Sequence, residues 1–179
     1  WPSSSPTRSR PSRAGPRSVR VLGIDPGVAT TGYGVVDGEP GGDPSLQEYG
    51  TIRTAPPTPM PERLLALHRG LQALIAEVKP QAVAVEELFF ASNASTAIAV
   101  GQARGVILLA AAQSCVPVFE YKPSEVKQAL TGYGGADKRQ MQDMLRLVLG
   151  LAEIPRPDDA ADGVAVALCH LQMARLREL

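Results

Sequence analysis

The chain has 179 residues, 44% of them hydrophobic, and its 18 basic and 18 acidic residues cancel to a formal net charge of zero. A chain of this length and composition is expected to fold as one globular domain. No stretch approaches the roughly 20 uninterrupted apolar residues of a membrane helix, and no secretory signal is recognisable, so we expect a cytoplasmic protein. In that compartment Cys115 and Cys169, which stand alone, are expected to be reduced and buried.

Charge is unevenly distributed along the chain. Residues 1–20 contain five of the 18 basic residues and no acid, which leaves 13 basic against 18 acidic residues in the remainder. The Pro-, Ser- and Arg-rich stretch 1–18 has no apolar periodicity, so we expect a disordered basic tail there and a single folded domain over 19–179. A net acidic body must segregate its charge to bind nucleic acid, unless divalent metal ions neutralise part of it.

Three strands are predicted first, over residues 20–25, 32–37 and 46–54. Their short connections predict an antiparallel meander. A Pro-rich segment over 55–61 separates the meander from a helix over 62–78. In that helix six apolar residues recur at helical spacing, namely Leu64, Leu67, Leu71, Leu74, Ile75 and Val78.

The second half of the chain alternates between short apolar strands and helices. Strands are predicted over 82–86 and 116–121, with an Ala- and Gly-rich helix over 93–113 between them. Helices over 123–130, 137–149 and 157–175 complete the chain, each beginning near a capping or first-turn residue. This order predicts an α/β fold with one mixed five-stranded sheet flanked by helices, its later strands joined in parallel through helical crossovers.

Four acidic residues stand out by their positions. Asp25 ends the first predicted strand and Glu86 the fourth, so the two carboxylates lie side by side if these strands are neighbours. Asp159 and Asp162 stand three residues apart at the start of the last helix, which places both on one face. Ordinary structural roles are open to three of them: a turn residue for Asp25, a strand exit for Glu86, and helix capping for Asp159 or the adjacent Asp158. Asp162 is harder to explain in this way because small and apolar residues surround it.

Clustered carboxylates suit divalent metal ions, since hard oxygen ligands hold hard cations such as Mg²⁺. Two ions about 3.5–4 Å apart can stabilise both the attacking and the leaving oxygen of a phosphodiester. Paired acids also serve as general acid and base on glycosides, but only 4% of the chain is aromatic, too little for the expected sugar platform. Oxygen ligands bind Mn²⁺ as well as Mg²⁺, and the sequence does not choose between them.

The remaining signal is a set of five short motifs in a fixed order. They are Gly-Ile-Asp-Pro-Gly at 23–27, Thr-Gly-Tyr-Gly at 31–34, Val-Glu-Glu at 85–87 followed by Phe89, Gly-Gln-Ala-Arg-Gly at 101–105 and Asp-Ala-Ala-Asp at 159–162. Together they resemble the RuvC family of Holliday-junction resolvases, from about Arg20 to about His170. The resemblance implies a ribonuclease-H-like fold, which agrees with the predicted order of strands and helices, and makes 19–179 a single nuclease domain.

By this resemblance Asp25, Glu86, Asp159 and Asp162 match the four metal-binding, catalytic acids of an endonuclease that resolves four-way DNA junctions in recombination and repair. Asp25 is expected to bridge two Mg²⁺ ions, with Mn²⁺ as a substitute. Glu86 is expected to hold the ion on the leaving-group side, and the two helix acids the ion that activates water. Hydrolysis would leave a 5′-phosphate and a 3′-hydroxyl.

The same resemblance implies nucleic-acid contacts. Lys127 and Lys138 match family lysines near the scissile strand, where contact with phosphates is a plausible role. Helical periodicity alone would make Lys127 a solvated surface residue. Phe89 matches an aromatic residue at the junction centre, where it could stack on an unpaired base.

The resemblance also implies a symmetric homodimer, built partly on the small residues of the helix over 93–113, with an active site for each of two strands. Packing of that helix on its own sheet is the alternative. Partnership with the branch-migration proteins RuvA and RuvB is implied as well. Two residues depart from the family pattern: Gly163 replaces an Ala, which should weaken its helix by up to about 1 kcal/mol, and Asp158 adds an acid beside Asp159, so the ligand within that pair stays open.

Two other functions are compatible with parts of the sequence. Gly-Ile-Asp-Pro-Gly followed by Thr30, Thr31 and Gly32 also resembles the first phosphate loop of actin-like ATPases and sugar kinases. Those proteins repeat the fold in two lobes and are much longer. A junction-binding module without catalysis would be expected to lack at least one of the four acids, and all four are present. The sequence does not indicate a cut-site preference or a role for the basic tail.

Overall fold

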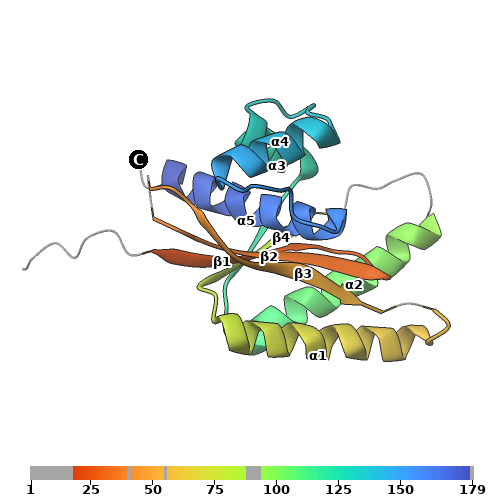
Figure 1. Ribbon diagram of the computed structural model, residues 1–179. Coiled ribbons are helices and arrows are strands. Elements are labelled where there is room, and N and C mark those ends of the chain that lie inside the picture. The colour runs from red at the N-terminus through yellow and green to blue at the C-terminus, as the bar shows by residue number, and fades with distance from the viewer. Residues whose placement is uncertain (1–17, 40–41, 55, 88–93, 178–179) are drawn as a thin grey trace, which may run out of the picture.

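A five-stranded mixed sheet forms the centre of the computed structural model, which describes residues 18–39, 42–54, 56–87 and 94–177 (Figure 1). The strands are β1 (Val19–Asp25), β2 (Thr30–Gly38), β3 (Ser45–Arg53), β4 (Ala82–Glu86) and β5 (Val118–Tyr121), in the spatial order β3-β2-β1-β4-β5. β1, β2 and β3 pair antiparallel, whereas β4 pairs in parallel with both β1 and β5. The predicted meander and the predicted parallel crossovers are both confirmed.

Helices cover both faces of this sheet (Figure 1). α1 (Met60–Val78) and α2 (Ala94–Gln113) lie on one face. α5 (Asp158–Arg177) lies on the other, and α3 (Pro123–Thr131) and α4 (Lys138–Val148) pack beyond it. Each face has its own apolar core, one between the sheet and α1 and α2, the other between the sheet and α3 to α5. Such layering buries the apolar stripe of each helix against the sheet.

Helix boundaries follow local capping chemistry. The Asp137 side chain accepts a hydrogen bond from the backbone N–H of Gln140 at 2.9 Å, and the Gln140 side-chain oxygen accepts one from the backbone N–H of Asp137. This capping box fixes the start of α4 and therefore the position of Lys138, its first residue. Pro123 occupies the first turn of α3, where a missing N–H costs nothing.

The N-terminal half of α5 lies almost in backbone contact with β1 and β2. A Cβ atom added to Gly32 would lie 1.8 Å from the carbonyl oxygen of Asp159, and one added to Gly163 would lie 2.6 Å from the Cα of Tyr33. Neither position can hold a side chain unless the helix moves away from the sheet. Close packing therefore explains the glycine at position 163, although glycine is expected to weaken the helix.

α2 is the most apolar helix, and its segment Thr96–Gln113 is long and apolar enough, by length and composition alone, to cross a membrane. Two sets of contacts show that this helix packs on the sheet. Ala103 and Ile107 are buried in the core under α1, and Arg104 in the middle of the helix forms an ion pair with Glu120 of β5. Core helices of globular proteins pass the same test.

The sequence-based expectations were wrong in two local respects. Cys115 is exposed, because it occupies the turn after α2 with a left-handed φ of 55°, while Cys169 is buried as expected and both thiols are free. The strand predicted from residue 116 begins at Val118. The expected tail over 1–18 lies outside the described residues except for Ser18.

Candidate active site

Asp25 and Glu86 meet at one edge of the sheet. β1 and β4 are parallel neighbours, with Ile24 opposite Val85, so each strand delivers the acid that follows to the same edge. Their carboxyl groups lie close enough to share a hydrogen bond, and both residues are half-buried. β1 and β4 are therefore adjacent, as the predicted pairing of Asp25 with Glu86 required.

α5 brings two further acids to this pair. Asp159 and Asp162 lie in its first turns, at the end of the helix that the glycines of β2 allow close to the sheet. Both are near enough to act on the carboxyl group of Asp25 through their charges, and Asp162 also acts on Glu86. The four acids singled out from the sequence thus form one electrostatic cluster drawn from two strands and one helix.

The cluster raises the proton affinity of its members. Burial, followed by the charge of Asp162, raises the pKa of Asp25 to about 6. Burial, followed by the charge of Asp25, raises the pKa of Glu86 to about 8. Their mutual hydrogen bond adds to the rise in the pKa of Glu86 and opposes the rise in the pKa of Asp25. Burial also raises the pKa of Asp162, against the opposing charge of Lys138.

Carboxyl groups that resist ionisation together are suited to a cation that removes the repulsion. The donor set offers only carboxylate oxygens, the ligands that hard divalent cations prefer. Among the described residues, however, no three Asp, Glu, His or Cys side chains already stand in the geometry of a metal-ion shell. The donors therefore fit such an ion chemically, and the α5 acids would have to turn toward Asp25 to share it.

Both lysines predicted from the sequence lie beside the acids. Lys127 of α3 and Lys138 of α4 line a pocket of about 220 Å³ together with Glu86 and Asp162. Pro123, Val126, Met141 and Ala165 form its remaining wall. The charge of Lys127 acts to lower the pKa of Glu86, and that of Lys138 acts to lower the pKa of Asp25. Phe89, the aromatic residue predicted to contact DNA, lies outside the described residues.

Sequence reasoning missed one polar residue close to Lys138 and to the pocket that it lines. Gln142 of α4 donates a hydrogen bond to Asp158 at 3.2 Å, and Lys138 forms an ion pair with the same carboxylate at 2.8 Å. The i, i+4 spacing of Lys138 and Gln142 on the predicted helix was the available signal.

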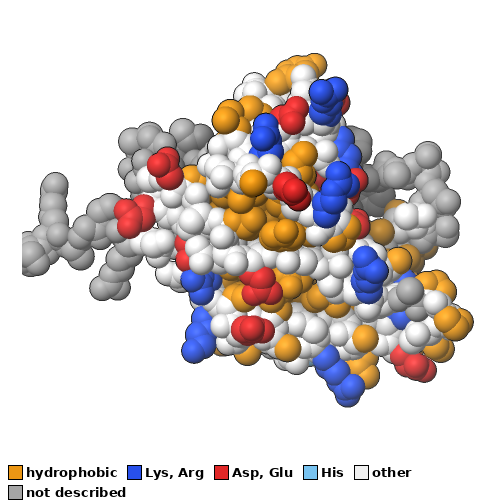
Figure 2. Space-filling view, in the orientation of Figure 1, with side chains coloured by type: hydrophobic (Ala, Val, Ile, Leu, Met, Phe, Trp, Pro, Cys, Tyr) orange, Lys and Arg blue, Asp and Glu red, His pale blue; other side chains and the backbone are white. Residues whose placement is uncertain are grey.

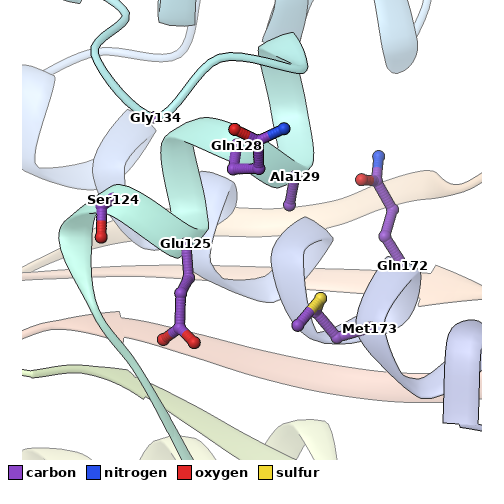
Figure 3. Close-up of a pocket in the computed structure, with 7 residues that line it drawn as sticks. All are labelled: Ser124, Glu125, Gln128, Ala129, Gly134, Gln172 and Met173. Atoms are coloured by element: carbon purple, nitrogen blue, oxygen red, sulfur yellow. The ribbon is translucent and has the colours of Figure 1, made fainter.

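A larger pocket, of about 530 Å³, lies elsewhere, between α3 and the C-terminal half of α5 (Figure 3). Ser124, Glu125, Gln128 and Ala129 border it on one side, and Gln172 and Met173 on the other. It contains none of the four clustered acids, so chemistry rather than volume identifies the candidate site.

On the face shown in Figure 2, Lys and Arg side chains recur toward the side on which β1 ends and α5 begins.

Comparison with known proteins shows which family this chain belongs to. The family model described as "Crossover junction endodeoxyribonuclease RuvC" matches residues 21–170. A curated protein of that name from Chloroflexus aggregans is 60% identical over 156 residues, covering 87% of this chain and 94% of that protein. This chain belongs to the crossover junction endodeoxyribonuclease RuvC family. RuvC from a Roseiflexus species is 57% identical over 157 residues, which cover 88% of this chain and 93% of that protein.

Solved structures of RuvC agree with this assignment. Thermus thermophilus RuvC superposes with a TM-score of 0.82 at 41% identity, covering 88% of this chain and 96% of that one. The same organism's RuvC in complex with a Holliday-junction substrate gives a TM-score of 0.81 at 39% identity, with the same coverage. The yeast mitochondrial Holliday-junction resolvase Ydc2, at 12% identity and a TM-score of 0.64, shares the fold. The predicted ribonuclease-H-like sheet is confirmed, and membership of the RuvC family removes the case for a kinase-like ATPase.

Proposed function

We propose that this protein resolves four-way DNA junctions by paired, metal-dependent hydrolysis of phosphodiester bonds during homologous recombination and repair. The observation that carries the proposal is the Asp25–Glu86 pair at one sheet edge, met by the acids of α5, in a chain 60% identical to a RuvC. In this proposal residues 19–179 form the nuclease domain, and the protein acts in the cytoplasm, where bacterial DNA lies. The basic tail over 1–18 has no assigned part in it.

Asp25, Glu86, Asp159 and Asp162 are the residues that would hold two Mg²⁺ ions, with Mn²⁺ as a substitute. Bound there, the ions would supply an activated water and stabilise the leaving oxygen of the phosphodiester. The chain's own part begins with the Asp25–Glu86 pair, whose raised pKa values mean that cation binding would displace a proton from the pair.

Lys127 and Lys138 complete the site by meeting the phosphates of the strand to be cut. Both line the pocket next to Glu86 and Asp162, so a phosphate held by either would lie close to the acids. Such contacts fix the register of the DNA without reading its sequence. Phe89 follows β4 by three residues and is proposed to stack on an unpaired base at the junction centre.

A second copy of this chain is the partner proposed for α2. Its side chains Ile98 and Leu109 are 65% and 51% exposed, which is unusual for a helix of this hydrophobicity. Gly105 leaves open space around its position, which would permit a neighbouring helix to approach closely. A two-fold dimer presents two equivalent active sites, as paired cleavage of strands of like polarity requires. RuvA and RuvB are proposed to deliver the junction.

A strand-specific cleavage assay tests the proposed function. Four synthetic junctions, each labelled on one strand, are incubated with the protein in Mg²⁺, in Mn²⁺ and in EDTA, beside a linear duplex made from the same arms. We expect symmetric nicks in two opposing strands, dependent on metal, with 5′-phosphate ends that a ligase can seal. Metal-dependent cutting of the duplex at the same rate would refute junction resolution, and junction binding without cleavage under any metal would leave a binding module.

A further inference from the structure

Asp158 is the first residue of α5 and the one acid beside the cluster whose role the sequence leaves open. Its two carboxylate oxygens have separate partners on α4. Oδ2 lies 2.8 Å from Nζ of Lys138, and Oδ1 accepts a hydrogen bond from Nε2 of Gln142 at 3.2 Å. Both partners lie on one face of α4, one helical turn apart. The carboxylate thus clamps the N-terminal turn of α4 to the N-terminus of α5.

The clamp acts on the side chain of Lys138, whose backbone position is already set by the capping box at the start of α4. Apolar contacts fix the middle and the C-terminal part of the helix, with Leu145 fully buried and Met141 and Val148 packed on the same core. Lys138, by contrast, is the first residue of α4 and its side chain is 55% exposed. A lysine side chain has four rotatable bonds, so without an anchor its ammonium group would sample a large volume.

Lys138 also lies within reach of the cleavage chemistry, because it lines the pocket that Glu86 and Asp162 line. An ammonium group has three N–H donors. The bond to Asp158 therefore leaves donors with which Lys138 can bind a phosphate, while the direction of the side chain is already set. Prior ordering of a side chain lowers the entropy lost when it binds.

We propose that Asp158 is a positioning residue for Lys138 rather than a ligand of the metal ions, and that it holds the lysine at the rim of the cluster for the strand being cut. This inference rests on the proposed junction cleavage. It separates the acids of α5 by their partners: Asp159 and Asp162 act on the carboxyl group of Asp25 through their charges, whereas both oxygens of Asp158 are engaged by α4.

Four variants test the assignment: Asp158→Ala, Asp158→Asn, Lys138→Ala and the double variant of Asp158→Ala with Lys138→Ala. The matched control is Asp143→Ala, which removes an exposed ion pair with Arg139 on the same helix, 3.9 Å in length. For each protein, Mn²⁺ affinity is measured by calorimetry without DNA. Junction affinity is measured in Ca²⁺, and the single-turnover cleavage rate in Mg²⁺.

With Asp158→Ala we expect Mn²⁺ affinity and junction affinity to stay within about two-fold of wild type, and the cleavage rate to fall about two- to five-fold, the range of an exposed ion pair. Asp158→Asn keeps one acceptor oxygen, which Lys138 can still use, but loses the second oxygen and the charge, so it should recover only part of the rate. In the Lys138→Ala background the loss of Asp158 should have no further effect, because there is no lysine left to position. The control should match wild type in all three measurements.

Three results would overturn the proposal. A fall of about ten-fold or more in Mn²⁺ affinity with Asp158→Ala would make Asp158 part of the metal site. An equal loss of rate in the Lys138→Ala background would give it a structural role independent of the lysine. An unchanged rate would mean that Lys138 needs no anchor, and a faster rate would mean that the carboxylate competes with DNA for Lys138. A wild-type protein that binds Mn²⁺ but cleaves no junction would instead refute the function on which this inference rests.

Discussion

Replacing Gly32 by Ala should damage the site through the backbone, without removing any acid. The new Cβ would lie 1.8 Å from the carbonyl oxygen of Asp159 and 2.3 Å from its carbonyl carbon. Because ordinary contact distances are near 3.5 Å, the start of α5 would have to move by roughly 1.5 Å. No side chain can rotate to relieve this overlap, since both atoms belong to the backbone. Asp159 and Asp162 would move with the helix, away from Asp25.

The size of the effect follows from overpacking and from misplacement of catalytic groups. Overpacking a tight contact costs about 1–3 kcal/mol, which lowers the melting temperature by about 2–12 °C in a chain of this size. A displacement of 1 Å at a catalytic centre can cost ~10²-fold in rate. We therefore expect a folded protein with a modestly lower melting temperature, weaker Mn²⁺ binding and roughly a hundred-fold slower cleavage.

Gly38 of the same strand provides the matched control. A Cβ added there would meet the Cδ1 atom of Leu171 at 2.9 Å, the far end of a flexible side chain that can turn away. Gly38→Ala should therefore retain Mn²⁺ affinity and cleavage rate. Calorimetry and single-turnover cleavage of a labelled junction would compare the two variants. If Gly32→Ala melted and cleaved like wild type, the close approach of α5 to β2 would not be what places the acids.

Three further predictions concern charge, assembly and DNA contact. Because the pKa values of Asp25 and Glu86 are raised to about 6 and about 8 from 3.8 and 4.5, these groups stabilise the metal-free fold most in acid, and their contribution is lost as the pH rises through those values. The melting temperature of metal-free protein should therefore fall between about pH 4 and pH 8 and level off above that. Mg²⁺ should restore it at the alkaline end, and Glu86→Gln should flatten the slope; a slope unchanged in that variant would contradict the assignment. Leu109→Asp, on the exposed face of α2, should yield a monomer in analytical ultracentrifugation, whereas Leu147→Asp, at a 71% exposed position on α4, should leave a dimer; two dimers would place the interface elsewhere. Lys127→Ala should reduce the slope of log affinity against log salt concentration for junction binding by about one, and an unchanged slope would mean that Lys127 contacts no phosphate.

Most of the fold was predictable because its signals are local. Short apolar runs between turn residues marked the strands, and the spacing from Leu67 to Val78 marked the buried face of α1. The neighbouring positions of Asp25 and Glu86 followed once β1 and β4 were assumed to pair, since parallel strands end at the same edge. Each of these inferences needs only the period of a strand or a helix and the direction of the chain.

Features that depend on contacts between distant segments were not predictable in this way. The near-backbone contact of α5 with β2 brings Gly32 against Asp159, residues 127 positions apart in the sequence. Gly32 and Gly34 lie on one face of β2, and that bare strip was the only local sign of the approach. The partners of Asp158 likewise come from another helix. Cys115 was expected to be buried by residue type, but a left-handed turn placed it at the surface.

The central claim is that the carboxylates of this cluster cut the junction, and one variant tests it most directly. Asp25→Asn keeps the size of the side chain and its contact with Glu86 while removing a charge from the middle of the cluster. We predict that it binds the four-way junction in Ca²⁺ as tightly as wild type and cleaves it at least ~10³-fold more slowly in Mg²⁺ or Mn²⁺, in line with the loss of a group essential for a metal-assisted reaction. Cleavage by Asp25→Asn at the wild-type rate, with wild-type binding, would contradict the assignment of this cluster as the active site.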